Sequence, residues 1–314
     1  MFNRIQSSKS FQLFNEIFGK SVGINCRYVS KKSALVTPPN YCLNLLRTHD
    51  YENFLCSLLL PNILRRSAFA IRAFNIEISK VQERVSDPKL GQMRFQFWQD
   101  TLEKLYKEII PQHPVALELF TAIKNHKLKK RHLQQLITSR TEHLLSPKYK
   151  SLEDVEKYSE QSVSSIYYLL LQSAGIENIH ADHAASHLGK AQGISNLIRS
   201  IPHNLQRRLL IFPQDILLKH NISQESILRA KNDKPIRDAV FEIASRANQH
   251  LEKARNLRKS IPKQSNILFL PAVSINSYLE RLQKIDFDVF HPQLQKRNNL
   301  LACSLYWNKL LSKY

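Results

Sequence analysis

The chain has 314 residues and is strongly basic, with 46 Lys and Arg residues against 26 Asp and Glu and a formal charge of +20 at pH 7. It contains only six glycines, too few for the many phosphate loops and tight turns of nucleotide-binding parallel sheets or β-sandwiches. The remaining composition favours helices, so we predict an all-α protein. The four cysteines form no Cys-x-x-Cys pair, which disfavours a zinc ribbon or a disulfide framework.

Residues 1–32 have the features of a mitochondrial presequence. They combine several Arg and Lys residues with frequent serines and one acid, Glu16, and Phe11, Phe14 and Phe18 can share one apolar helical face. An ordinary exposed basic helix or a flexible tail is the alternative. Residues 33–40 contain the break Thr37-Pro38-Pro39-Asn40 and are interpreted as a linker.

From residue 41 to 314, apolar residues recur at spacings of three and four, which predicts a single domain built as a helical bundle. No uncharged apolar run reaches the ~18 residues that a membrane-spanning helix requires, so we expect a soluble or peripheral protein. Prolines stand at most of the predicted breaks. The predicted helices are 41–48, 50–60, 62–83, 88–107, 113–125, 129–145, 151–173, 180–209, 213–219, 223–231, 233–260, 274–284 and 293–312.

Two of these helices carry polar stripes on otherwise apolar segments. Helical spacing puts Arg72, Asn75, Ile76 and Ser79 on one face of the first. On the second helix the stripe consists of Asn196, Ser200, His203, Asn204 and Arg207. Facing polar stripes are how helical bundles build ligand and metal sites.

These two segments resemble the active-site motifs of the squalene and phytoene synthases, which have the all-α isoprenoid synthase fold. The first family motif reads Arg-x-x-Asp-Asp-x-x-Asp. The second reads Gln-x-x-Asn-x-x-Arg-Asp-x-x-Glu-Asp and is followed by an arginine and Leu-Pro. In that family the acids hold Mg²⁺ ions that neutralise a departing diphosphate. The residues of this chain that match the motifs are Arg72, Asn196, Arg199, Arg207 and, near the Leu-Pro, Phe212-Pro213.

The resemblance fails at every position where the metal would bind. The acids of the first motif are replaced by Asn75, Ile76 and Ser79, and those of the second by Ser200, His203 and Asn204. Neutral side chains are poor ligands for magnesium, so we expect a pseudoenzyme without a metal or other cofactor. Pro202 stands inside the second motif, where we expect a kink.

Segments 41–47, 54–61, 70–77, 93–98, 180–193 and 286–292 resemble one branch of the family, the assembly factors of mitochondrial respiratory complex I. The likeness covers roughly residues 41–314. It implies a location on the matrix side of the inner membrane, peripheral membrane contact, and a role in building complex I with its subunits or assembly intermediates as partners.

The retained arginines suggest a vestigial cavity that holds an apolar, isoprenoid or anionic-headed ligand. The predicted cavity residues are Arg72, Asn75, Ser79, Asn196, Arg199, Ser200, His203, Asn204 and Arg207. A buried arginine needs a partner, and the alternative is that these arginines pair with acids elsewhere in the bundle.

Other signals have simpler interpretations. His180, Asp182, His183 and His187 could include a zinc-binding pair, but no closed ligand set is evident. Asp286 and Asp288 are interpreted as turn-capping acids. An apolar face is assigned to the core; it consists of Met93, Phe97, Trp98, Leu102 and Leu105.

The densest basic run lies at Lys124, Lys127, Lys129, Lys130 and Arg131, and is interpreted as solvated helix ends. Its functional alternatives are anionic lipid or RNA, and the lack of interleaved aromatic residues disfavours nucleic acid. Two other functions stay open. One is an active prenyl-diphosphate transferase with an altered site, and the other is a mitochondrial RNA- or lipid-binding module.

Overall fold

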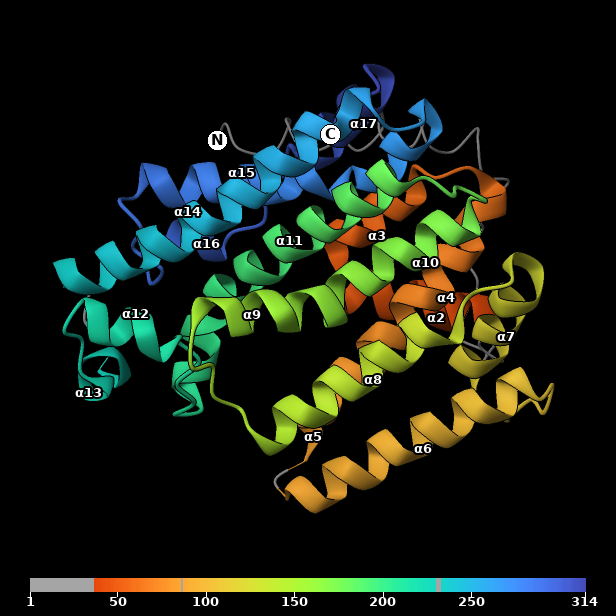
Figure 1. The fold of residues 1–314 in the computed structure, drawn as a ribbon, viewed down its shortest axis with the longest axis horizontal. Coiled ribbons are helices and arrows are strands. Elements are labelled where there is room, and N and C mark those ends of the chain that lie inside the picture. Colours follow the sequence, from red (N-terminus) through yellow and green to blue (C-terminus); the bar gives the residue numbers. More distant parts are fainter. Residues whose placement is uncertain (1–36, 86, 230–232) are drawn as a thin grey trace, which may run out of the picture. The chain divides into compact units, whose positions relative to one another are not determined.

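The computed structural model describes residues 37–85, 87–229 and 233–314, and this part of the chain contains helices and no strand, which confirms the predicted all-α class (Figure 1). The predicted presequence, residues 1–32, and residues 33–36 of the predicted linker lie outside the described residues. The first described helix begins at Pro38, inside the segment 33–40 that was interpreted as linker.

The α-helices are α2 Pro38–His49, α3 Tyr51–Leu58, α4 Asn62–Ser79, α5 Val81–Arg84, α6 Pro88–Tyr106, α7 Pro114–His126, α8 Lys130–Leu145, α9 Leu152–Ser159, α10 Ser165–Ser173, α11 Ile179–Gln206, α12 Gln214–Lys219, α13 Gln224–Leu228, α14 Lys234–Asn256, α15 Pro271–Lys284, α16 Pro292–Gln295 and α17 Leu301–Leu310. A π-helical turn, η1 Glu160–Ser164, joins α9 to α10, and η2 Leu257–Lys259 and η3 Lys263–Phe269 are 3₁₀ helices. No helix in these ranges is both long and apolar enough to cross a membrane.

Most predicted helices are confirmed, and the differences lie at boundaries. The helix predicted over 62–83 breaks at Lys80, just after Ser79 turns its hydroxyl onto the carbonyl of Ile76 (2.9 Å). The helix predicted over 293–312 is two helices, α16 and α17, because the Asn298 side chain caps the amide of Leu300 in the intervening turn. The helix predicted over 274–284 begins earlier, at Pro271. Helix α11 continues through Pro202 to Gln206.

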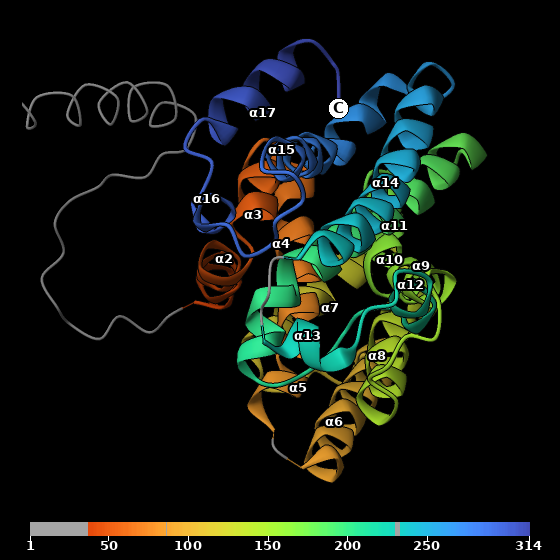
Figure 2. The same cartoon turned by 90° about the vertical axis from the view of Figure 1, so that its left-hand side faces the viewer.

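The centre of the bundle is α11, which packs against α14 on one side and against α9, η1 and α10 on the other (Figures 1 and 2). Two glycines permit this close approach. A Cβ atom on Gly189 would lie 2.5 Å from the Cα of Ser164, and one on Gly193 would lie 2.4 Å from the Cβ of Ser159. Because no side chain separates the helices here, the stripe that follows Gly193 is held close to η1.

Helix α6 lies at the edge of the bundle and packs mainly on α8 (Figure 1). The predicted core face of this helix is partly wrong. Trp98, Leu102 and Leu105 are buried, but the side chains of Met93 and Phe97 are 68% and 51% exposed. Because α6 lies at the edge of the bundle, only the side that faces α8 and the neighbouring α5 and α7 is covered.

Candidate functional site

Two adjoining hollows lie where α4, α8, η1 and α11 meet, and together they are called the polar cavity here. The first has a volume of about 490 Å³ and the second about 800 Å³. They share the lining residues His49, Ser79, Arg140, Ser162, Val163 and Asn196. The polar cavity is therefore one continuous region between the two helices that carry the predicted stripes.

The structure brings eight of the nine predicted cavity residues to this region. Lining residues of the first hollow are Arg72, Asn75, Ser79, Asn196 and Arg199. Those of the second include Ser79, Asn196, Ser200, Asn204 and Arg207. His203 lines neither hollow, because its side chain is exposed to solvent in the last turn of α11.

Arg72 is 3% exposed and has an incomplete set of partners. Its Nη1 lies 4.0 Å from Oδ2 of Asp50, which stands between α2 and α3. Within the described residues, its buried Nε has no hydrogen-bond partner. Burial raises the pKa of Asp50, and the attraction of Arg72 opposes that rise. Asp50 at 4.0 Å therefore compensates the charge of Arg72 only in part, and the unpaired buried N–H carries a cost.

Arg140, on α8, is a cavity residue that sequence reasoning missed. Its Nη2 donates to Oδ1 of Asn75 at 2.6 Å, and its Nη1 donates to the carbonyl of Leu136 at 2.7 Å. All its acceptors among the described residues are neutral, and burial lowers the pKa of this guanidinium. Only the facing helix distinguishes Arg140 from any other arginine on an amphipathic helix, so no local sequence signal could have found it.

Arg199 has a carboxylate partner, as the alternative interpretation of the arginines expected. Its Nη1 lies 2.8 Å from Oε2 of Glu52, and its guanidinium lies over the ring of Tyr278 at 4.3 Å. Arg297 stacks in the same way on Tyr51, at 4.7 Å. The arginines around the first hollow are thus only partly neutralised by acids.

The polar groups of the second hollow are largely occupied by their own helix. The hydroxyl of Ser200 donates to the carbonyl of Leu197 at 2.8 Å, and the amide of Asn204 donates to the carbonyl of Ser200 at 3.0 Å. Asp50, Glu52 and Glu83 are the lining acids of the two hollows. Across the described ranges, no group of three or more His, Cys, Asp or Glu side chains is arranged to hold a metal ion.

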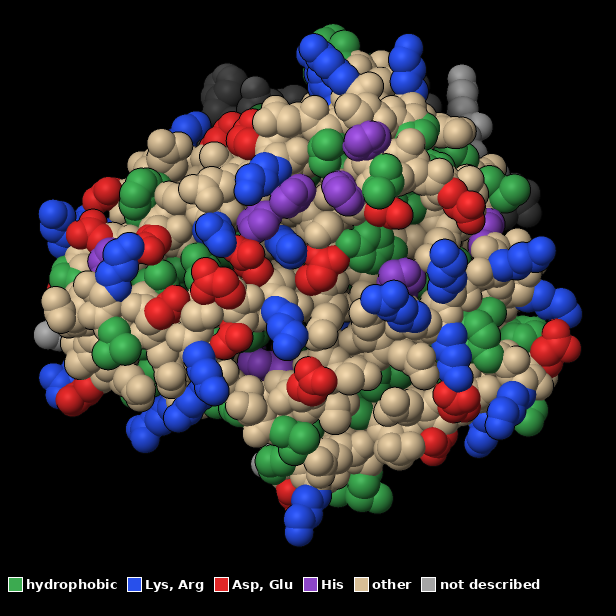
Figure 3. Space-filling view, in the orientation of Figure 1, with side chains coloured by type: hydrophobic (Ala, Val, Ile, Leu, Met, Phe, Trp, Pro, Cys, Tyr) green, Lys and Arg blue, Asp and Glu red, His purple; other side chains and the backbone are tan. Residues whose placement is uncertain are grey.

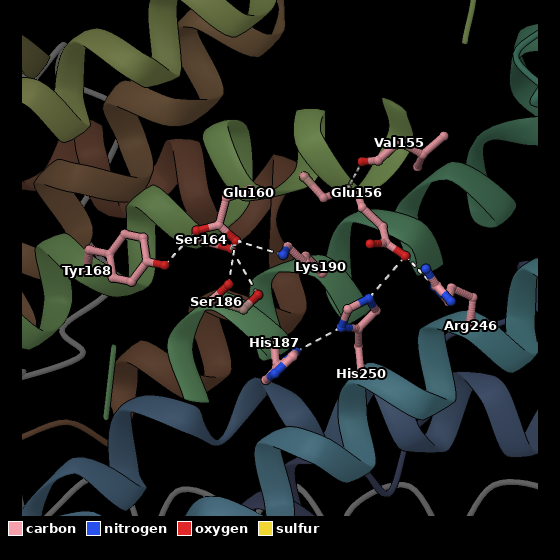
Figure 4. Close-up of polar contacts among 11 residues, drawn as sticks. Val155, Glu156, Glu160, Ser164, Tyr168, Ser186, His187, Lys190, Arg246 and His250 are labelled. Carbon is pink, nitrogen blue, oxygen red and sulfur yellow. Dashed lines mark hydrogen bonds and ion pairs between the residues drawn. The ribbon is translucent and has the colours of Figure 1, made fainter. Parts of the chain in front are cut away.

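The predicted histidine cluster is split by the structure. His187 faces His250 on α14, with their Nδ1 atoms 2.9 Å apart, whereas His180 and His183 are exposed (Figure 4). Nε2 of His250 in turn lies 3.2 Å from Oε1 of Glu156, which is also paired with Arg246. Burial, with a further contribution from His250, lowers the pKa of His187 to about 4. This chain of contacts ties α9, α11 and α14 together.

A second polar cluster in Figure 4 centres on Glu160 of η1. Its Oε1 accepts from the hydroxyl of Tyr168 at 2.6 Å and its Oε2 from that of Ser186, also at 2.6 Å. Lys190 lies 3.7 Å from the same carboxylate. The π-helical turn is therefore joined to α11 by hydrogen bonds as well as by the glycine contacts.

The remaining predicted signals have structural roles. Asp288 accepts a hydrogen bond from the amide of Phe290 at 2.9 Å, as expected of a turn-capping acid, whereas Asp286 pairs with Arg237 at 2.6 Å. The basic run lies at the junction of α7 and α8, where Lys130 pairs with Glu103 at 2.5 Å.

Comparison with known proteins gives three consistent results. Residues 46–299 match the family described as squalene/phytoene synthase. The protein from Mus musculus named NADH dehydrogenase (ubiquinone) complex I, assembly factor 6, is 46% identical over 272 residues, covering 86% of this chain and 82% of the mouse protein. Its homolog from Drosophila melanogaster is 41% identical, covering 87% and 84%. The crystal structure of a dehydrosqualene synthase in complex with ligand superposes with a TM-score of 0.76 at 16% identity, covering 88% of this chain and 97% of that one.

Proposed function

This chain belongs to the squalene/phytoene synthase family, and from its likeness to the assembly factor 6 proteins we propose that it is an assembly factor for mitochondrial respiratory complex I. The observation that carries the proposal is the identity of 46% across 86% of the chain. Its partners are complex I subunits or assembly intermediates. It acts in the mitochondrion, on the matrix side of the inner membrane, and the presequence-like composition of residues 1–32 supports that location.

The chain does this without prenyl-transfer catalysis. Magnesium requires hard anionic oxygen ligands, and the stripe positions carry asparagine, serine, isoleucine and histidine instead. The amide oxygen of Asn75 accepts from Arg140 (2.6 Å) and the hydroxyl of Ser79 donates to its own helix (2.9 Å), so both groups are already engaged. In this cavity a departing diphosphate would lack the metal cluster that stabilises it, so the prenyl-transfer step is not catalysed.

The polar cavity retains a ligand-binding role in this proposal. The neutral hydrogen-bond acceptors of Arg140 and the volume of the first hollow, about 490 Å³, favour a ligand with an anionic head. Native mass spectrometry of gently purified protein should detect such a ligand. Its absence there, with no change in thermal stability on adding candidate lipids, would contradict the ligand role.

The experiment that tests the assembly function is deletion of the gene followed by native-gel analysis of the respiratory complexes. We expect selective loss of complex I, restored by the wild-type chain. Intact complex I after deletion would refute the assembly role.

Two further assays separate the alternatives. Turnover of a prenyl diphosphate with Mg²⁺ by the purified wild-type chain would establish a transferase. RNA crosslinks concentrated at residues 124–131, with strong salt dependence, would establish an RNA-binding module.

A further inference from the structure

The C-terminal helix α17 exposes an apolar stripe that the polar cavity does not use. Its inner side is buried, with Leu301 and Leu305 3% and 0% exposed. Its outer side carries Leu300, Trp307, Leu310 and Leu311, whose exposed fractions are 72%, 63%, 59% and 46%. Spacings of three, four and seven residues place these side chains on one face. Large apolar side chains grouped on a surface indicate an interaction site.

The sequence segments around this stripe are rich in basic residues, and the nearest acids, Glu52, Glu252 and Glu280, lie at their margins. Residues 289–314 contain four Lys and Arg residues and no Asp or Glu, and residues 253–279 contain five and none. The two segments are in contact: the hydroxyl of Tyr314 donates to the carbonyl of Ala254 and the amide of Asn266 donates to that of Ser312, each at 3.0 Å. They form one end of the bundle, called the basic end here.

Several charges at the basic end are uncompensated. Lys259, Lys263, Lys309 and Lys313 are exposed, and none forms an ion pair within the described part of the chain. Figure 3 shows Lys and Arg side chains beside hydrophobic ones along the upper edge, over the region where Figure 1 places α17. An apolar stripe and unpaired positive charge therefore occur together.

We propose that the stripe of α17 and the basic end form a docking surface for anionic phospholipid. Tryptophan and leucine can enter the headgroup boundary of a bilayer while the ammonium groups of lysine attract anionic lipid heads. A second copy of this chain is disfavoured as the occupant, because two surfaces with an excess of positive charge repel each other. The inference deepens the proposed function and rests on its membrane contact, which it assigns to one face of the molecule.

The exposed face of α6 provides a contrast. It also presents apolar side chains, Met93 and Phe97, but its charges are mixed: Asp100 lies on the same helix, and Glu77 lines the adjoining groove together with Arg84 and Arg94. A face of mixed charge matches an anionic surface less well than the basic end does. Phe97 is 51% exposed and serves as a matched control for Trp307.

The test uses the full chain with vesicles of phosphatidylcholine alone or mixed with phosphatidylglycerol. The chain has two tryptophans, of which Trp98 is 5% exposed and Trp307 63%. We expect the mixed vesicles to shift the tryptophan emission to shorter wavelength. Vesicles of phosphatidylcholine alone should cause no shift, and added salt should abolish the shift seen with the mixed vesicles. This readout is local to α17, so it is separate from membrane binding by the basic residues 1–32. No shift with the mixed vesicles, or a shift with an RNA oligonucleotide instead, would overturn the proposal.

Vesicle flotation of variants gives the second readout. The double variant Trp307→Ser and Leu310→Ser should bind mixed vesicles at least about tenfold more weakly than the wild type, and Phe97→Ser should bind like the wild type. Equal binding by the double variant and the wild type contradicts the proposal. Vesicle flotation does not depend on complex I. A negative flotation result would therefore contradict the lipid surface but not the assembly function. Intact complex I after gene deletion would contradict the assembly function but not the lipid surface.

Discussion

Oδ1 of Asn75 accepts a hydrogen bond from Nη2 of Arg140 at 2.6 Å, so an amide of α4 and a guanidinium of α8 meet at the wall of the polar cavity. The contact places a cation beside the stripe that resembles a metal-binding motif. A positive charge at this position repels Mg²⁺ and attracts anions, which suits a cavity that binds an anionic head without metal.

The first prediction concerns Asn75. Asn75→Leu removes the acceptor of Arg140 and should lower the free energy of unfolding by about 2 kcal/mol, because a buried donor loses its partner. Asn75→Asp should pair with Arg140 and raise stability by about 1 kcal/mol. Urea unfolding measures both. Magnesium-dependent turnover of a prenyl diphosphate by Asn75→Asp would show that the site is closer to catalysis than we propose.

A second prediction concerns the contact between α11 and the segment around η1. A methyl group on Gly193 would lie 2.1 Å from Oγ of Ser159, and both residues belong to packed helices that must shift to accept it. Gly193→Ala should therefore cost about 2 to 3 kcal/mol of stability despite the higher helix propensity of alanine. Asn196→Ala, at an exposed position of the same helix, is the control. Equal melting temperatures for the two variants would refute the close approach.

The third prediction is a pH dependence from His143. Its ring stacks on Tyr149 at 5.0 Å, and burial, aided by Arg140, lowers its pKa from 6.5 to about 4. The unfolded chain then binds the proton more readily than the folded chain. The stability from this group is complete above pH 6.5 and falls as the pH drops towards 4, by about 1.4 kcal/mol per pH unit.

His143→Phe keeps the aromatic contact and removes the titration. Urea unfolding of this variant at several pH values should show a shallower loss of stability between pH 6.5 and 4 than the wild type shows. Parallel curves for the two proteins would mean that the His143 ring is protonated in the folded state.

The fourth prediction concerns the ion pair of Arg199 and Glu52, whose side chains are 31% and 37% exposed. Solvent screening should limit the coupling free energy between Arg199→Ala and Glu52→Ala to about 1 kcal/mol or less. Arg199→Lys keeps the positive charge but should still lower the free energy of unfolding, because an ammonium cannot stack on Tyr278 as a guanidinium does. A double-mutant cycle by urea unfolding measures the coupling. A value of several kcal/mol would mean that the pair is more desolvated than its exposure indicates.

Periodicity and composition were sufficient for the fold class and for most helices, because these depend on short-range spacing within one helix. The stripe residues could also be identified from the sequence, since residues three and four apart in a helix share a face. Met93 and Phe97 were misassigned to the core because amphipathic spacing does not say how far a packing partner extends around a helix. The break at Lys80 and the turn at Asn298 arise from local hydrogen bonds that leave little trace in the hydrophobic pattern.

The amino-acid sequence alone determined that the chain is helical, that its two polar stripes lack acids, and that it resembles the squalene and phytoene synthases. Only the tertiary structure decided which polar side chains meet: Arg140 with Asn75, Arg199 with Glu52, and His187 with His250. The reason is physical. Helix formation is governed by neighbours within about four residues, whereas each of these contacts joins side chains more than sixty positions apart, and their partners are set by how whole helices pack.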